Sequence, residues 1–248
     1  MSKTVQKSTT FLILLLFLIA SCKKENACDC FKSTGDITTE MRDVSNFSSI
    51  YVSDNVNLYL TQDSVFSVKV EAGKHLISLI TTEVENGSLR IQNKNKCNWM
   101  RSYKPKVNAY VSLPSLLYME SSGAGTVTTT NTFTGDSLRF DSKNASGDLT
   151  MAVDVKKCFI IINTGSLNVT LNGKADDLEL YYNGYGMIHC ENVLARQVLA
   201  TNKSTGNLFV NVTEAIYYHI SYDGNIYYYG NPSVIEGTDT GRGELLKK

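Results

Sequence analysis

Hydrophobic and polar residues alternate in short runs along the second half of the chain, and each run follows a glycine. The phrase glycine, any residue, then Val, Leu or Ile occurs seven times, with its glycines at positions 125, 147, 165, 186, 206, 224 and 243. Successive glycines are 22, 18, 21, 20, 18 and 19 residues apart. A repeat of about twenty residues with a fixed turn residue is typical of a stacked β-solenoid in which each repeat forms one coil.

The alternation within each repeat predicts its strands. Positions two, four and six beyond the glycine are apolar, as in Leu149, Met151 and Val153, whereas Thr150 between them is polar. A period of two indicates a strand with one buried face. A second apolar run precedes the next glycine, which can form the corner because it adopts positive φ easily. We therefore expect an all-β fold, a right-handed parallel β-helix (β-solenoid) with coils of about 20 residues.

The N-terminal residues and the repeat pattern together divide the chain into three segments. Residues 1–21 are expected to be a lipoprotein signal peptide, residues 22–41 a lipidated tether, and residues 42–248 a single β-helix domain. Within this domain, residues 42–115 should form irregular opening coils and residues 116–248 the regular coils with a C-terminal cap. We expect Gly230-Asn231-Pro232 and the charged C-terminal tail to form that cap, because an uncovered terminal strand recruits other chains.

The first 22 residues carry a targeting signal. Lys3 and Lys7 precede an apolar run at residues 11–19, which is too short to anchor in a bilayer and is typical of a secretion signal. The run ends in Ile19-Ala20-Ser21-Cys22, which resembles a bacterial lipobox. We expect Cys22 to be lipidated, so that N-terminal lipid holds the protein at the membrane. Lysines follow Cys22, and the expected location is the outer membrane, on its surface or its periplasmic face.

Composition and cysteine spacing narrow the chemistry. The 24 basic and 24 acidic residues cancel, so nucleic acid is not an expected partner. An exported protein can form disulfides, and the candidate bridge joins Cys30, or alternatively Cys28, to Cys97. Zinc-ligand spacings and phosphate-binding glycine loops are absent from the sequence. We therefore expect no metal, no cofactor and no catalytic residues.

The outward position three residues beyond each glycine carries the most distinctive side chains. In successive coils it is Thr128, Thr150, Asn168, His189, Phe209 and Tyr227. The last three are expected to form an exposed ladder with Tyr229 beside it. Such a ladder is either a surface that binds sugar rings or apolar partners, or a stack that stabilises the sheet. Two further tripeptides, Asp-Ser-Val and Asp-Ser-Leu, match a short O-glycosylation signal and make Ser64 and Ser137 candidate acceptors.

Several segments resemble the head GIN domain family. They are residues 40–50, 68–72 and 87–91, the glycine corners, and Tyr228-Tyr229-Gly230-Asn231-Pro232. The family consists of lipoproteins and exported proteins abundant in Bacteroidetes, described as auto-transporter adhesin heads. The resemblance spans residues 40–246, and it implies a β-helical fold and an envelope location. It supplies no catalytic residues.

These observations lead to three hypotheses of function. The first is a non-catalytic, lipid-anchored envelope protein that presents its β-helix for recognition or adhesion, with a glycan or a cell-surface protein as its partner. The alternative is a structural or scaffolding envelope lipoprotein with no dedicated ligand. The third is a β-helical polysaccharide-active enzyme, whose signature would be an acidic pair that converges across neighbouring coils.

Overall fold

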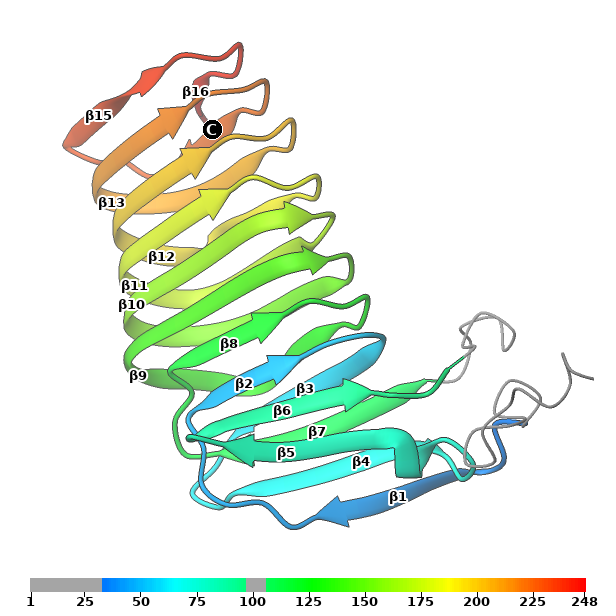
Figure 1. Cartoon of the computed structure of the whole chain (residues 1–248). Helices are drawn as coiled ribbons and strands as arrows, with labels where there is room; N and C mark the ends of the chain where they lie inside the picture. Colours follow the sequence, from blue (N-terminus) through cyan, green and yellow to red (C-terminus); the bar gives the residue numbers. More distant parts are fainter. Residues whose placement is uncertain (1–32, 97–105) are drawn as a thin grey trace, which may run out of the picture.

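The computed structural model describes residues 33–96 and 106–248, and the statements below concern these residues. Its strands stack along one axis as a β-solenoid (Figure 1). The expected all-β solenoid is therefore confirmed. The lipidation candidate Cys22 and the disulfide candidates Cys28, Cys30 and Cys97 lie outside the described residues.

Sixteen strands and one 3₁₀ turn make up the described fold. In chain order they are β1 (Ile37–Arg42), β2 (Ser49–Val52), β3 (Val56–Gln62), β4 (Ser67–Gly73), the 3₁₀ turn η2 (Ile77–Leu79), β5 (Ile80–Glu85), β6 (Ser88–Asn93), β7 (Val107–Leu113), β8 (Tyr118–Ser121), β9 (Val127–Ala145), β10 (Asp148–Gly165), β11 (Asn168–Tyr182), β12 (Ile188–Asn202), β13 (Leu208–Ile220), β14 (Ile226–Tyr229), β15 (Val234–Asp239) and β16 (Leu245–Lys247).

Each regular coil is one long strand that bends, returns on the opposite side and ends in a tight turn (Figure 1). In β10, residues 148–155 and residues 157–165 both pair in parallel with β9 and β11. We call the side formed by the first halves of β9–β13, with β1, β3, β4, β7, β14 and β16, the first sheet. The second halves, with β2, β5, β6, β8 and β15, form the second sheet. The bend lets one strand contribute to both sheets.

The strand register confirms the coil length. Asp148 pairs with Asn168, and Ile188 pairs with Leu208, so partners in neighbouring coils are 20 residues apart in both pairs. Parallel pairing at this period satisfies the backbone groups of each coil through the coils on either side. It also places equivalent side chains in columns along the solenoid axis.

The inward columns form one continuous apolar core between the two sheets. Leu149, Met151 and Val153 are at most 1% exposed, as the alternation predicts. The second sheet contributes an inward column of its own, made of Leu138, Cys158, Leu178, Val198 and Ile216. Because each inward side chain is covered by the coils above and below, the inward columns of the interior coils stay buried.

The opening segment departs from the expected series of coils. The pairs β3–β7 and β2–β6 are parallel, but β1–β4, β4–β7 and β5–β6 are antiparallel. The β5–β6 connection explains one reversal, because Asn86 and Gly87 both have positive φ (49° and 73°), which is the geometry of a two-residue hairpin turn. Strand β1 begins at Ile37, inside the stretch expected to be tether. The folded part therefore starts before residue 42.

One glycine alignment is also wrong. Leu149 pairs with Val169, not with Leu167, and Val169 pairs with Ile188. Gly165, with φ +103°, pairs with Ala145 at the end of the preceding strand half. The corner position that is glycine in neighbouring coils is therefore Leu167 in this one. The consequence is a shift of two residues, so that Thr170 and not Asn168 occupies the outward column.

Candidate recognition surfaces

The first sheet carries a continuous outward column of aromatic residues and threonines. The strand pairings place the following side chains in one line along the axis: Lys69, Tyr110, Tyr59, Thr128, Thr150, Thr170, His189, Phe209 and Tyr227. We call this line the aromatic column. Three threonines at its centre separate one aromatic stack near the N-terminal end from another near the C-terminal end.

The predicted ladder of three rings is present and is tightly stacked. The His189 and Phe209 ring centroids are 4.8 Å apart with planes at 4°, and those of Phe209 and Tyr227 are 5.0 Å apart at 15°. The His189 Nδ1 atom lies 3.0 Å from Glu191 Oε1. The Tyr227 ring has the Lys248 ammonium 4.5 Å from its centroid. The strand spacing of about 4.8 Å accounts for this geometry, because rings in register are held at stacking distance.

This stacking limits what the aromatic column can bind. A sugar ring packs on the face of an aromatic ring, but here the Phe209 faces are taken by its two neighbours and one Tyr227 face is covered by Lys248. Only ring edges therefore point outward from the centre of the stack. Tyr59 and Tyr110 repeat the arrangement, with centroids 5.0 Å apart and the Lys69 ammonium 4.3 Å from the Tyr110 ring. The geometry favours cross-strand stabilisation of the sheet.

The other sequence candidates are spread over the molecule. Tyr229 lies on the same sheet but pairs with Asn211, outside the ring stack. Ser64 is exposed in the turn between β3 and β4, where its hydroxyl donates to Asp63 at 3.2 Å. Ser137 is part of β9 and pairs with Lys157. Ser64 is thus presented on a turn, whereas Ser137 is held in a strand.

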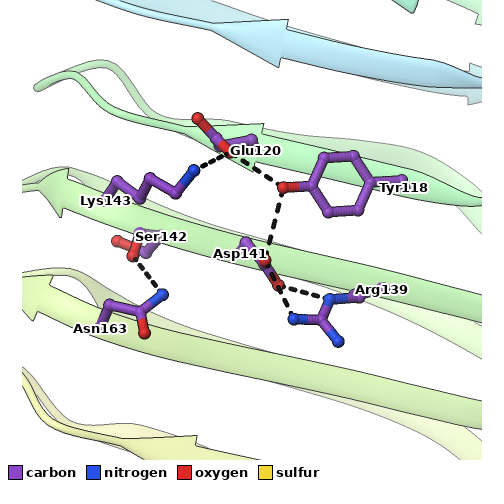
Figure 2. A network of polar contacts seen from close by, with 7 residues as sticks. All are labelled: Tyr118, Glu120, Arg139, Asp141, Ser142, Lys143 and Asn163. Atoms are coloured by element: carbon purple, nitrogen blue, oxygen red, sulfur yellow. Dashed lines mark hydrogen bonds and ion pairs between the residues drawn. The ribbon is translucent and has the colours of Figure 1, made fainter.

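A polar network lies on the second sheet where the irregular coils meet the regular ones (Figure 2). Glu120 and Asp141 are direct neighbours across two coils, and the Tyr118 hydroxyl contacts both, at 2.9 Å and 3.4 Å. Arg139 forms two hydrogen bonds with Asp141, at 2.8 and 3.1 Å, and Lys143 binds Glu120 at 2.8 Å. Burial and the hydrogen bond to Glu120 raise the pKa of Tyr118, so this phenol stays protonated as a donor.

This network contains the acidic pair that an enzyme hypothesis requires, but its geometry suits a structural role. Each carboxylate is held by its own cation and by the shared phenol, and the Glu120 and Asp141 side chains are only 16% and 11% exposed. The hydrogen bond to Asp141 raises the pKa of Arg139, and the one to Glu120 raises the pKa of Lys143, so both cations keep their charge. The arrangement ties β8 to β9 and leaves little carboxylate surface for a saccharide.

The second sheet also carries a groove that sequence reasoning missed. Its volume is about 510 Å³, within the ~300–1,000 Å³ of small-ligand sites. It crosses β10, β11, β12 and β13 and is lined by Lys157, Phe159, Asp177, Leu178, Glu179, Gln197, Val198, Leu199 and Tyr217. We call it the second-sheet groove. Four neighbouring strands at about 4.8 Å spacing give it a length near 14 Å along the axis.

The second-sheet groove combines an apolar floor with a polar rim. Phe159, Leu199 and Tyr217 belong to one outward column, in which Glu179 is the only charged member between them. Leu199 and Tyr217 are 46% and 38% exposed. At the rim, Arg196 binds Asp177 at 3.2 Å and Glu214 at 3.0 Å. The signal in the sequence was an apolar residue at the outward position in the second halves of β10, β12 and β13, namely Phe159, Leu199 and Tyr217.

Within residues 33–96 and 106–248, no group of His, Cys, Asp and Glu side chains is arranged to hold a metal ion. In the same part of the chain, no helix has the length and apolar character needed to cross a membrane.

The fold and surfaces define a class of protein: a β-solenoid with broad, open sheet faces. A family model assigns the chain more closely. Residues 46–232 match the family described as "Putative auto-transporter adhesin, head GIN domain", and the chain belongs to this family. The resemblance drawn from the sequence is confirmed. A search of the curated proteins gives no match.

Solved structures share the fold. A "putative adhesin" from Bacteroides fragilis matches with a TM-score of 0.76 and 23% identity, covering 86% of this chain and 97% of its own. One from Parabacteroides merdae matches with a TM-score of 0.68, 18% identity and the same coverage. A "putative lipid binding protein" from Parabacteroides distasonis matches with a TM-score of 0.57 and 18% identity over 86% and 97% of the two chains. At these identities the likeness concerns the fold alone.

Proposed function

We propose that this chain is a lipid-anchored, non-catalytic protein of the outer membrane that recognises glycans through the second-sheet groove. The observation that carries the proposal is the groove itself, where exposed apolar side chains lie beside carboxylate and amide groups. Sugars present the same two features, because apolar C–H faces alternate with hydroxyl groups. Tyr217 and Phe159 offer ring surface, and Asp177, Glu179 and Gln197 offer hydrogen-bond partners.

The anchoring part of the proposal rests on the sequence. The lipobox-like ending at Cys22 supports N-terminal lipidation, and membership of an adhesin-like family supports an envelope location. The proposed orientation is outward, so the partners are the membrane, through lipid, and an external glycan. The exposed Ser64, and Ser137 in β9, are the proposed O-glycosylation acceptors, to be tested by a mass increment in protein from the native host.

A scaffolding role is the second candidate, and one observation favours it. The outward-facing rings of His189, Phe209 and Tyr227 stack face to face on one another. A surface built this way stabilises the sheet without any ligand. An envelope scaffold would therefore have the same aromatic column, and its second-sheet groove would bind no ligand.

A glycan array with two matched double variants separates these readings. Leu199→Ala with Tyr217→Ala removes the exposed floor of the groove, and Phe209→Ser with Tyr227→Ser removes the aromatic column from the other sheet. The proposal expects wild-type binding to fall at least tenfold in the first variant and to persist in the second. Loss only in the second would move the site to the aromatic column. Binding of no glycan by the wild-type protein would favour the scaffold.

A further inference from the structure

The C-terminal end of the solenoid has two open strand edges. Strand β15 pairs only with β13, and β16 pairs only with β14, within the described part of the chain. In Figure 1 these two strands form the outermost coil, with no further strand stacked on them. Within residues 106–248, the tail that was expected to form a cap forms the last coil instead. An exposed edge is a template for pairing with another strand.

The apolar core is also uncovered at this end. Ile235 continues the inward column of Leu138, Cys158, Leu178, Val198 and Ile216. Those five are at most 1% exposed, but Ile235 is 46% exposed. Leu245 similarly continues the column of the fully buried Leu208 and Ile226 and is only half-buried. The opposite end differs, since η2 and the start of β5 bury Leu76, Ile77 and Ile80 to 2–3% exposure.

The two open edges have opposite charge. Strand β15 carries Glu236 and Asp239 and no basic residue, whereas β16 and the residue after it carry Lys247 and Lys248 and no acidic residue. Consecutive halves of a coil run in opposite directions. A two-fold axis along the strands and between the sheets would therefore bring β15 of one molecule beside β16 of the other, antiparallel. The acidic β15 edge of each molecule then faces the basic β16 edge of the other, so the dimer contains two such contacts.

We infer that the open end is a self-recognition site at which β15 and β16 pair with β16 and β15 of a second copy, tip to tip. The partner is a second copy because it supplies both complementary edges and the matching apolar cross-section. Strand β1 lies at the other end of the solenoid (Figure 1), so the dimer holds the two N-terminal ends far apart. Given the proposed lipid anchor, on which this step rests, the two copies would belong to facing membranes.

The size of the end predicts a weak contact. Six residues of β15 at 3.3 Å each span about 20 Å, and two sheets about 10 Å apart with their side chains span roughly another 20 Å. Each copy then buries on the order of 400 Å², or about 800 Å² in total, which is the range of transient contacts. Micromolar or weaker dimers are expected, with array avidity of about 10²–10⁴ on a surface.

Charge reversal tests the inference without disturbing the core. Variant A carries Glu236→Lys and Asp239→Lys, and variant B carries Lys247→Glu and Lys248→Glu. Sedimentation equilibrium up to about 500 µM should show wild-type dimers, and at least tenfold weaker self-association of A alone and of B alone. An equimolar mixture of A and B should associate again, because every edge then meets its opposite. Ile235→Asp should abolish the dimer, whereas Ile37→Asp at the other end should not.

Beads bearing the protein through an N-terminal biotin test the facing geometry. Wild-type beads should cluster, beads with A or B alone should not, and mixed A and B beads should. A monomeric wild-type protein, an A and B mixture that stays monomeric, or equal effects of Ile235→Asp and Ile37→Asp would each overturn the inference. Glycan binding by the groove is measured in a separate assay. A failure to bind glycans therefore does not affect the dimerisation result, and a failure to dimerise does not affect the glycan result.

Discussion

Asn202 links the corners of two successive coils through hydrogen bonds. It is fully buried, and its Nδ2 atom donates to the Gly206 and Gly224 carbonyl oxygens, both at 3.0 Å. Its Oδ1 atom accepts from the Ser204 amide at 3.0 Å. One amide thus satisfies the corner of its own coil and the corner of the next. Substitution by Ala removes these three hydrogen bonds and a longer one to the Asn225 carbonyl oxygen (3.4 Å), and it leaves buried backbone groups without partners.

The expected loss follows from these contacts. Each unsatisfied buried group costs about 1–3 kcal/mol, so the loss of partners for three groups in Asn202→Ala should lower the free energy of unfolding by at least about 3 kcal/mol. At about 2–4 °C per kcal/mol for a domain of this size, the Tm should fall by at least about 6–12 °C. Asn183 is the matched control, because it makes a similar bond to the Asn163 carbonyl at 3.1 Å but is exposed. Asn183→Ala should change stability by less than about 1 kcal/mol.

The variant Asn202→Asp adds a test of the donor role. A buried carboxylate cannot donate to the two carbonyl oxygens, so the folded state should raise the pKa of this Asp. Its stability is then greatest below the unfolded pKa of about 4 and is lost as the pH rises through the folded pKa. Urea unfolding at pH 4 and pH 7 measures the difference. A loss below about 1 kcal/mol for Asn202→Ala, or a pH dependence equal to wild type for Asn202→Asp, would refute the reasoning.

A corner glycine, a buried cysteine and a stacked ring give three other predictions. A Cβ at Gly224 would lie 2.0 Å from the Gly206 carbonyl oxygen, so Gly224→Ala should lower the urea midpoint strongly. Gly135→Ala, with no atom within 4 Å of its Cβ, should change the free energy of unfolding by less than about 0.5 kcal/mol. Burial raises the pKa of Cys158 to about 12 from 9.0, so stability should fall between pH 9 and 12 by up to about 1.4 kcal/mol per unit, less so in Cys158→Val. Phe209→Ser should cost about 1–2 kcal/mol in thermal unfolding through lost stacking, and an unchanged Tm would contradict that role.

Alternation and glycine spacing were sufficient to predict the regular coils. Alternate residues of a strand point to opposite faces, so a period of two places Leu149 and Met151 on one apolar face, and that face packs into the core. The Gly165 coil shows the limit of this reasoning. In this coil Gly165 lies two residues before the corner. Only the pairing of Leu149 with Val169, and of Val169 with Ile188, shows that Leu167 occupies the corner position. The antiparallel opening strands were missed because local alternation is the same in hairpins and coils.

The candidate sites were predicted less well than the fold. Because His189, Phe209 and Tyr227 each lie three residues beyond a repeat glycine, the sequence predicts that they form a ladder. It does not predict that the rings stack face to face and so cover the surfaces a sugar would contact. The second-sheet groove depends on four side chains from separate coils, Phe159, Glu179, Leu199 and Tyr217, whose shape as a hollow appears only after folding. The polar network of Figure 2 likewise joins residues up to 23 positions apart.

The central claim is that the protein is exposed on the envelope for recognition, and protease treatment of intact cells tests it most directly. Cells that express the protein natively would be shaved, and the protein would then be detected by blotting, with a periplasmic protein as the control for membrane integrity. The account predicts loss of the signal while the control is retained. Full protection until the outer membrane is opened would contradict an outward-facing recognition protein.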